Sequence, residues 1–145
     1  MRAALVGAAL LAALLVASAM RTDIKKGVII RRILPEMEPV IRAAREAFAK
    51  VGAPAEITGA WRQDPSSKHS EDLALDYKVK HIAPTLWETV ALDIAILIGP
   101  AFDVVLERDT STAPLADENN SHIHVEYDPA AWKSARSYGF SVANI

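Results

Sequence analysis

Residues 73–79 read LALDYKV, a run in which apolar and polar side chains alternate. Successive side chains of a strand point to opposite faces, so Leu75 and Tyr77 share one face while Asp76 and Lys78 share the other. The pattern predicts a strand with one apolar face and one polar face. A single carboxylate on such a face is an ordinary solvent-facing group, so its neighbours decide what it can do.

The sequence on either side of this strand predicts further strands and helices. Apolar residues at three- and four-residue steps indicate a helix at residues 35–50, which Gly52 is placed to end. We also expect an apolar helix packed on the sheet at 84–99, strands at 55–61, 102–108 and 121–127, loops at 62–72 and 109–120, and a short terminal helix at 129–140. Residues 21–34 carry no pattern that assigns them. This order predicts an α+β fold with a small, mostly antiparallel sheet and flanking helices.

Composition narrows the classes of function. The chain has 145 residues, which is enough for a single domain, and we expect a monomer. Its net charge of −2 gives no basic excess, which argues against a nucleic-acid partner. There is no cysteine, so disulfides and thiolate metal sites are excluded. Any metal ion must therefore be held by His, Asp or Glu.

Residues 1–19 predict a targeting segment. Arg2 precedes an uncharged, Ala- and Leu-rich run, and the small residues at 17–19 suit cleavage after Ala19 by signal peptidase. On this reading residues 20–145 form the mature domain, exported to the periplasm or the extracellular space. Three alternatives stay open: an uncleaved membrane anchor, a weakly apolar signal later released from the membrane, and a translation start at Met20. Contact with a membrane is expected only through this segment.

Two of the four histidines lie two residues apart in SHIHVEY, residues 121–127. On a strand, His122 and His124 project from one face while Ile123 points into the core. His69 and Asp76 form a second group about fifty residues upstream, with His69 in a polar loop from which the chain can turn back. Together these side chains suffice for a catalytic zinc site with three protein ligands and one open position. Each residue alone is equally compatible with a solvated surface group.

These residues carry a resemblance to a known family. SKHSEDLALD, residues 67–76, resembles the Ser-x-His-x6-Asp motif of the LAS metallopeptidases, a group that includes D-Ala-D-Ala carboxypeptidases, L-alanyl-D-glutamate endolysins and the zinc domain of hedgehog proteins. ENNSHIH, residues 118–124, resembles their second motif, in the variant with a Glu four residues before His-x-His. The resemblance extends over residues 36–128 and implies a hedgehog/D-Ala-D-Ala-peptidase-like fold.

The resemblance assigns a role to each matching residue. It implies one zinc ion held by His69, Asp76 and His124. Glu118 becomes the general base toward the water that the metal activates, and Asp117 is the fallback base. His122 stabilises the oxyanion or assists proton transfer, and Arg62 anchors a substrate carboxylate or amide oxygen. The family usually has Gly where this chain has Asp72; because Asp tolerates positive φ better than most residues, we expect the turn to survive.

The implied function is a zinc-dependent peptidase that hydrolyses peptidoglycan stem peptides or cross-links, as a cell-wall hydrolase or phage-type endolysin. Carboxypeptidases and endopeptidases of this group use the same arrangement of zinc ligands, so the sequence does not identify which peptide bond is cut. The alternatives are a non-catalytic, hedgehog-like zinc-binding interaction module and a structural domain whose histidines are incidental.

Overall fold

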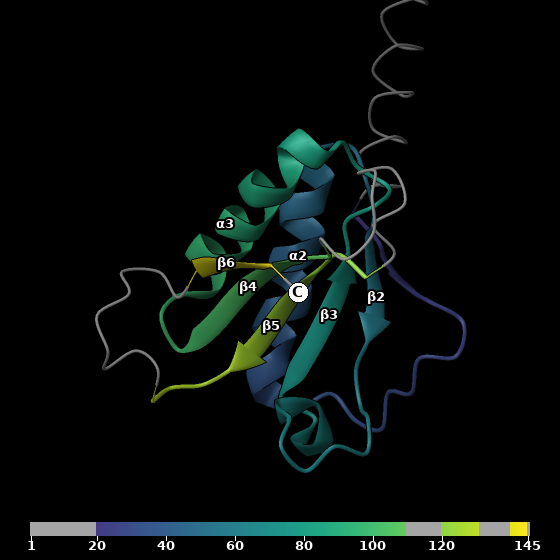
Figure 1. The fold of residues 1–145 in the computed structure, drawn as a ribbon, viewed down its shortest axis with the longest axis vertical. Coiled ribbons are helices and arrows are strands. Elements are labelled where there is room, and N and C mark those ends of the chain that lie inside the picture. Colours follow the sequence, from purple (N-terminus) through teal and green to yellow (C-terminus); the bar gives the residue numbers. More distant parts are fainter. Residues whose placement is uncertain (1–19, 110–119, 131–139, 145) are drawn as a thin grey trace, which may run out of the picture.

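The computed structural model of the chain describes residues 20–109, 120–130 and 140–144. In these ranges a six-stranded sheet has both α-helices against one of its faces (Figure 1). The strands are β1 (Thr22–Ile24), β2 (Ala55–Gly59), β3 (Ala74–Lys78), β4 (Phe102–Arg108), β5 (His122–Tyr127) and β6 (Phe140–Asn144), in the spatial order β1-β2-β3-β5-β4-β6. The helices are α2 (Glu38–Lys50) and α3 (Trp87–Ile98), and 3-10 turns occupy η1 (Pro35–Met37), η2 (Lys68–Glu71) and η3 (Pro84–Leu86).

The sheet is mixed rather than uniformly antiparallel. The central strands β2, β3, β5 and β4 pair antiparallel, whereas the outer strands β1 and β6 pair parallel with their neighbours. The α+β prediction is confirmed, and the antiparallel prediction holds for the centre of the sheet. The unassigned region 21–34 supplies β1. The terminal helix predicted over 129–140 is wrong at its end, because Phe140 begins β6 and lies opposite Val104; residues 131–139 lie outside the described ranges.

Both helices follow the sequence pattern. Helix α2 buries its apolar stripe, and the chain leaves it through Gly52, whose φ of 75° favours glycine. Helix α3 buries Trp87 and Ile94 against the sheet, but Ile96 and Leu97 are exposed, so the expected burial holds for one face only. Within the described part of the chain, no helix has both the length and the apolar character needed to span a membrane.

The two faces of the sheet divide as the alternation predicts. Tyr77 on β3 and Ile123 on β5 are fully buried in the core between sheet and helices. The intervening residues project from the opposite face, which the described helices leave open (Figure 1). Residues Asp76 and His124 are direct cross-strand partners there, as are Lys78 and His122. The central antiparallel pair thus brings the two sequence motifs together on the open face.

The turn between η2 and β3 connects two of the predicted zinc ligands, His69 and Asp76, and sets their relative position. Asp72 caps η2 with φ 61° and ψ 24°, the left-handed conformation expected at this position. Its carboxylate is buried and accepts a hydrogen bond of 2.8 Å from Nε of Arg32. Arg32 belongs to the segment between β1 and η1, so this ion pair ties that segment to the turn.

We expect Asp72→Ala to destabilise the fold more than Asp72→Gly. Both changes remove the pair with Arg32, but only alanine pays a steric cost at positive φ, about 1 kcal/mol. Urea denaturation measures the two free energies of unfolding. Equal losses would show that the left-handed backbone is not maintained in solution.

Candidate functional site

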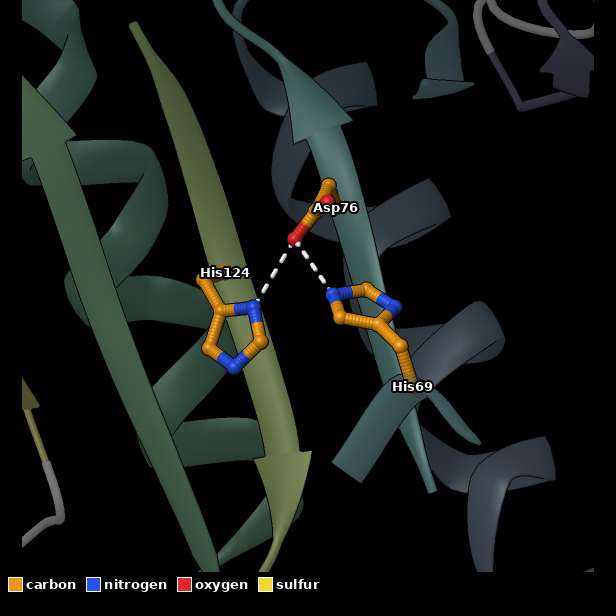
Figure 2. Close-up of side chains that lie close together, drawn as sticks. All are labelled: His69, Asp76 and His124. Carbon is orange, nitrogen blue, oxygen red and sulfur yellow. Dashed lines mark hydrogen bonds and ion pairs between the residues drawn. The ribbon is translucent and has the colours of Figure 1, made fainter. Parts of the chain in front are cut away.

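The three predicted metal ligands converge on the open face of the sheet. His69 comes from η2, Asp76 from β3 and His124 from β5. Oδ1 of Asp76 lies 3.1 Å from Nε2 of His69 and 2.8 Å from Nδ1 of His124. Figure 2 shows the two rings reaching this single oxygen from either side. His69 is fully buried and Asp76 is nearly so, which makes this a shielded polar cluster rather than a surface group.

Each imidazole is also held through its second nitrogen. Nδ1 of His69 donates to the carbonyl oxygen of Ala60, and Nε2 of His124 lies 3.2 Å from Oε2 of Glu126. Backing of this kind, by a carbonyl and a carboxylate, is how metal-binding histidines are oriented in proteins.

The contacts of His69 require a proton or a metal ion between its ring and Asp76. A carbonyl oxygen can only accept, so Nδ1 of His69 carries the proton in the neutral ring and Nε2 carries a lone pair. That lone pair faces a carboxylate oxygen 3.1 Å away, which is repulsive unless a proton or a metal ion lies between them. The buried geometry therefore calls for a proton or a metal ion at the point where the three side chains meet.

The same three residues fit a metal ion. One ligand atom from each lies within 4.8 Å of the others. A tetrahedral zinc ion with nitrogen and oxygen ligands places them roughly 3.3 Å apart. The two nitrogen–oxygen pairs, now 3.1 and 2.8 Å, need to open by only a few tenths of an ångström. Two nitrogens and one oxygen form a typical donor set for catalytic zinc, which keeps a fourth position for water.

Gly59 makes the position of Asp76 possible. Strand β2 has an irregular register at this point, and Gly59 lies directly opposite Asp76. A Cβ atom built on Gly59 would approach Oδ2 of Asp76 to 2.1 Å, far inside van der Waals contact. Sequence reasoning missed Gly59, although a glycine inside a strand pattern often marks a close approach of the backbone to another group.

Electrostatics reinforce the cluster. Burial alone would raise the pKa of the Asp76 carboxyl, but its contacts with His124 and His69 outweigh burial and lower that pKa far below its usual value. Burial likewise opposes charge on His124, yet its bonds to Asp76 and Glu126 raise the pKa of His124 to about 9. In the metal-free protein the cluster is thus an ionised carboxylate beside a protonated imidazole.

His122 lies next to this cluster. Its Nε2 is 3.6 Å from Oδ1 of Asp76 and 3.0 Å from Oε2 of Glu107, and its Nδ1 donates to the carbonyl of Asn120. Glu107 is the cross-strand partner of His122 on β4. Sequence reasoning missed Glu107, because the sequences of two strands separated by a loop do not show which residues pair across them.

Arg62 lies at the edge of the cluster. Its Nη2 is 3.8 Å from Oδ2 of Asp76, and its side chain is more than half exposed. It lines two neighbouring hollows, of about 360 and 620 Å³, which also share Asp76. Glu118, the predicted base, and Asp117, its fallback, lie outside the described residues.

Comparison with known proteins adds no relative: no protein-family model matches the chain, and neither a curated protein nor a solved structure does so. The geometry of the site is therefore the main basis for a functional proposal.

We expect Gly59→Ala to weaken zinc binding strongly while the fold persists. The added methyl group must push the Asp76 carboxylate away from the two imidazoles. Calorimetric titration with zinc measures the affinity, and circular dichroism checks the fold. Gly52→Ala is the control, since a Cβ there meets nothing within 4 Å and only backbone strain changes. Equal affinity of the Gly59 variant and wild type would contradict this account of Asp76.

The metal-free protein should lose stability as the pH rises from 6.5 to about 9. The pKa of His124 is 6.5 in the unfolded chain and about 9 in the fold, so its protonation favours folding fully below pH 6.5 and not above 9. Urea midpoints of chelator-treated protein across this range measure the loss. His124→Gln removes the titrating group and should flatten the profile; a flat wild-type profile would refute the coupling.

Proposed function

We propose that this protein is a zinc-dependent peptidase with a LAS-type, hedgehog/D-Ala-D-Ala-peptidase-like fold. The observation that carries the proposal is the convergence of His69, Asp76 and His124, with the outer nitrogen of each imidazole held by an acceptor. Two imidazoles and one carboxylate, contributed by two central strands of the sheet and one 3-10 turn, form the donor set of a hydrolytic zinc site. The resemblance of both motifs to the LAS metallopeptidases supports the same assignment.

The chain's own residues divide the remaining work. When bound, zinc would supply a Lewis acid that polarises a substrate carbonyl and acidifies a water molecule. His122 is placed to stabilise negative charge that develops on the carbonyl oxygen, and Glu107 and the Asn120 carbonyl hold its ring. Arg62 lines both hollows, where it can orient a substrate oxygen. Glu118 remains the proposed base on the strength of the motif.

The proposed substrate is the peptide part of peptidoglycan. The predicted export signal would deliver the domain to the compartment that contains this polymer, and the enzymes that the motifs resemble include peptidoglycan peptidases. The alternative is a zinc-binding interaction module without catalysis, as in hedgehog proteins. It shares the same ligands and differs only in whether a bond is cut.

Purified protein loaded with zinc should release stem-peptide fragments from peptidoglycan, detected by mass spectrometry. Removing zinc with a chelator should abolish release, and restoring zinc should recover it. Glu118→Gln should lower the rate by a factor on the order of 10²–10⁴ without loss of zinc, the range for a general base. Glu38→Gln, an exposed change on α2 away from the site, is the matched control.

Three outcomes separate the alternatives. Full activity of the Glu118 variant would remove it from the role of base. Stoichiometric zinc without product on several peptidoglycan types would favour the binding module. Substoichiometric zinc in protein that was never exposed to a chelator would overturn the metal site and leave a structural domain.

A further inference from the structure

Exposed apolar side chains gather on the β1 border of the sheet. Of the large apolar side chains that stay exposed in the described part of the chain, half belong to residues 20–33, namely Met20, Ile24, Ile29 and Ile33. These residues form β1 and the connection after it, the purple segment that runs outside β2 in Figure 1. Single apolar residues scattered over a surface are ordinary, whereas a group of them points to a partner.

The connection after β1 opens with a tight turn. The backbone N–H of Val28 donates to the carbonyl of Lys25 at 3.1 Å, the hydrogen bond that closes a four-residue turn. The chain is tied to the β2 segment on both sides of this turn. The N–H of Lys25 donates to the carbonyl of Ile57, and the carbonyl of Ile29 accepts from the N–H of Trp61. The backbone therefore fixes the directions in which the side chains of the turn project.

The β1 turn, defined as residues 24–29, presents two isoleucines that the core does not use. Val28 packs against the core, whereas Ile24 and Ile29 are 56% and 54% exposed. Because the turn is hydrogen-bonded to the sheet, this exposure comes from an ordered backbone. Two large apolar side chains kept in water cost free energy, which contact with an apolar phase would recover.

The same turn carries two lysines without acidic partners. Lys25 and Lys26 are exposed, and no ion pair among the described residues includes either of them, whereas Arg21 and Arg32 each have one. Residues 20–34 as a whole contain five basic residues and one acidic residue, in a chain whose net charge is −2. Basic groups beside exposed apolar groups are the combination that anionic lipid surfaces attract.

The combination favours a bilayer over a soluble polyanion. A soluble polyanion would engage the lysines but would leave Ile24 and Ile29 in water. At a bilayer, isoleucines enter the boundary between headgroups and acyl chains while lysines reach the lipid phosphates. The uncharged, apolar run that predicts targeting ends at Met20, directly before β1. Because that run would bring the chain to a membrane, the β1 border is the part of the described fold that follows it there.

We propose that the β1 turn binds the surface of a bilayer that carries anionic headgroups. Ile24 and Ile29 enter the interface, and Lys25 and Lys26 contact the lipid phosphates. This contact goes beyond residues 1–19 and does not depend on the proposed peptidase activity. Two isoleucines and two lysines give weak, reversible binding that salt screens. Since Lys25 also lines both hollows, the contact would hold the proposed site close to the membrane surface.

A fluorescent label on the turn tests the contact in the full chain. The protein has no cysteine, so Ile29→Cys can be labelled at that position alone with nitrobenzoxadiazole, a dye that brightens in apolar surroundings. Its fluorescence should rise with vesicles of phosphatidylglycerol and phosphatidylcholine, and much less with phosphatidylcholine alone. Ile96→Cys on α3 replaces an isoleucine that is 53% exposed and should show no such rise. Residues 1–19 are present in every protein compared, so their contribution is shared.

A charge variant tests the lysines in the labelled protein. Lys25→Gln/Lys26→Gln should weaken binding to the anionic vesicles by roughly thirtyfold, the size expected for two lysines at such a surface. Arg42→Gln/Lys50→Gln removes the same charge from α2 and should bind as the unsubstituted protein does. Raised salt should bring the affinity of the unsubstituted protein toward that of the lysine variant. Circular dichroism checks that each variant is folded.

The outcomes decide between this contact and its alternatives. An equal dye response to neutral and anionic vesicles would overturn the proposal, and so would unchanged affinity in Lys25→Gln/Lys26→Gln. A response at residue 96 as large as that at residue 29 would place the contact on another face. Lysine-dependent binding of polyphosphate without any dye response to vesicles would make a soluble polyanion the partner. Each of these results is independent of whether stem peptides are cleaved, so the peptidase proposal stands or falls separately.

Discussion

One oxygen atom, Oδ1 of Asp76, organises the open face of this protein. It has a histidine nitrogen on either side and belongs to a side chain that is almost fully buried. A buried carboxylate is costly unless compensated, and the two imidazoles compensate it only if positive charge lies between them and the oxygen. Neighbouring residues stabilise this arrangement. Gly59 leaves space for the carboxylate, and the Ala60 carbonyl and Glu126 hold the two rings in place.

The same arrangement places the proposed zinc ligands and the neighbouring hollows on partly different elements of the fold. Two of the ligands are anchored on central strands that pack on the core, and the third lies in a short turn capped by Asp72. The hollows that would receive a substrate lie toward the β1 side, where Lys25 and the segment around Gly27 form the wall. A peptide bound there would lie next to Asp76, the ligand that lines both hollows.

The sequence predicted the parts of the site that depend on local geometry. Alternation placed Asp76 opposite the core, parity placed His122 and His124 on one face, and the chemistry of Asp allowed the left-handed turn at residue 72. What it did not predict depends on register and on backbone atoms. The pairing of Glu107 with His122 needs the alignment of β4 with β5, and the Ala60 carbonyl has no side-chain signal. Strand β6 was missed because five residues are too short for a periodicity to outweigh a helical reading of the preceding sequence.

Strand β1 bears on how the protein would reach its compartment. Only Met20 and Arg21 separate Thr22, the first residue of β1, from the peptide bond after Ala19, and the carbonyl of Arg21 already accepts a hydrogen bond from Ala55. A protease needs an extended stretch of chain on both sides of the bond it cuts. Removal of a leader at this bond would therefore have to precede the docking of β1 onto β2. In that order, the leader would be removed first, and β1 would then pair with β2 at the edge of the sheet.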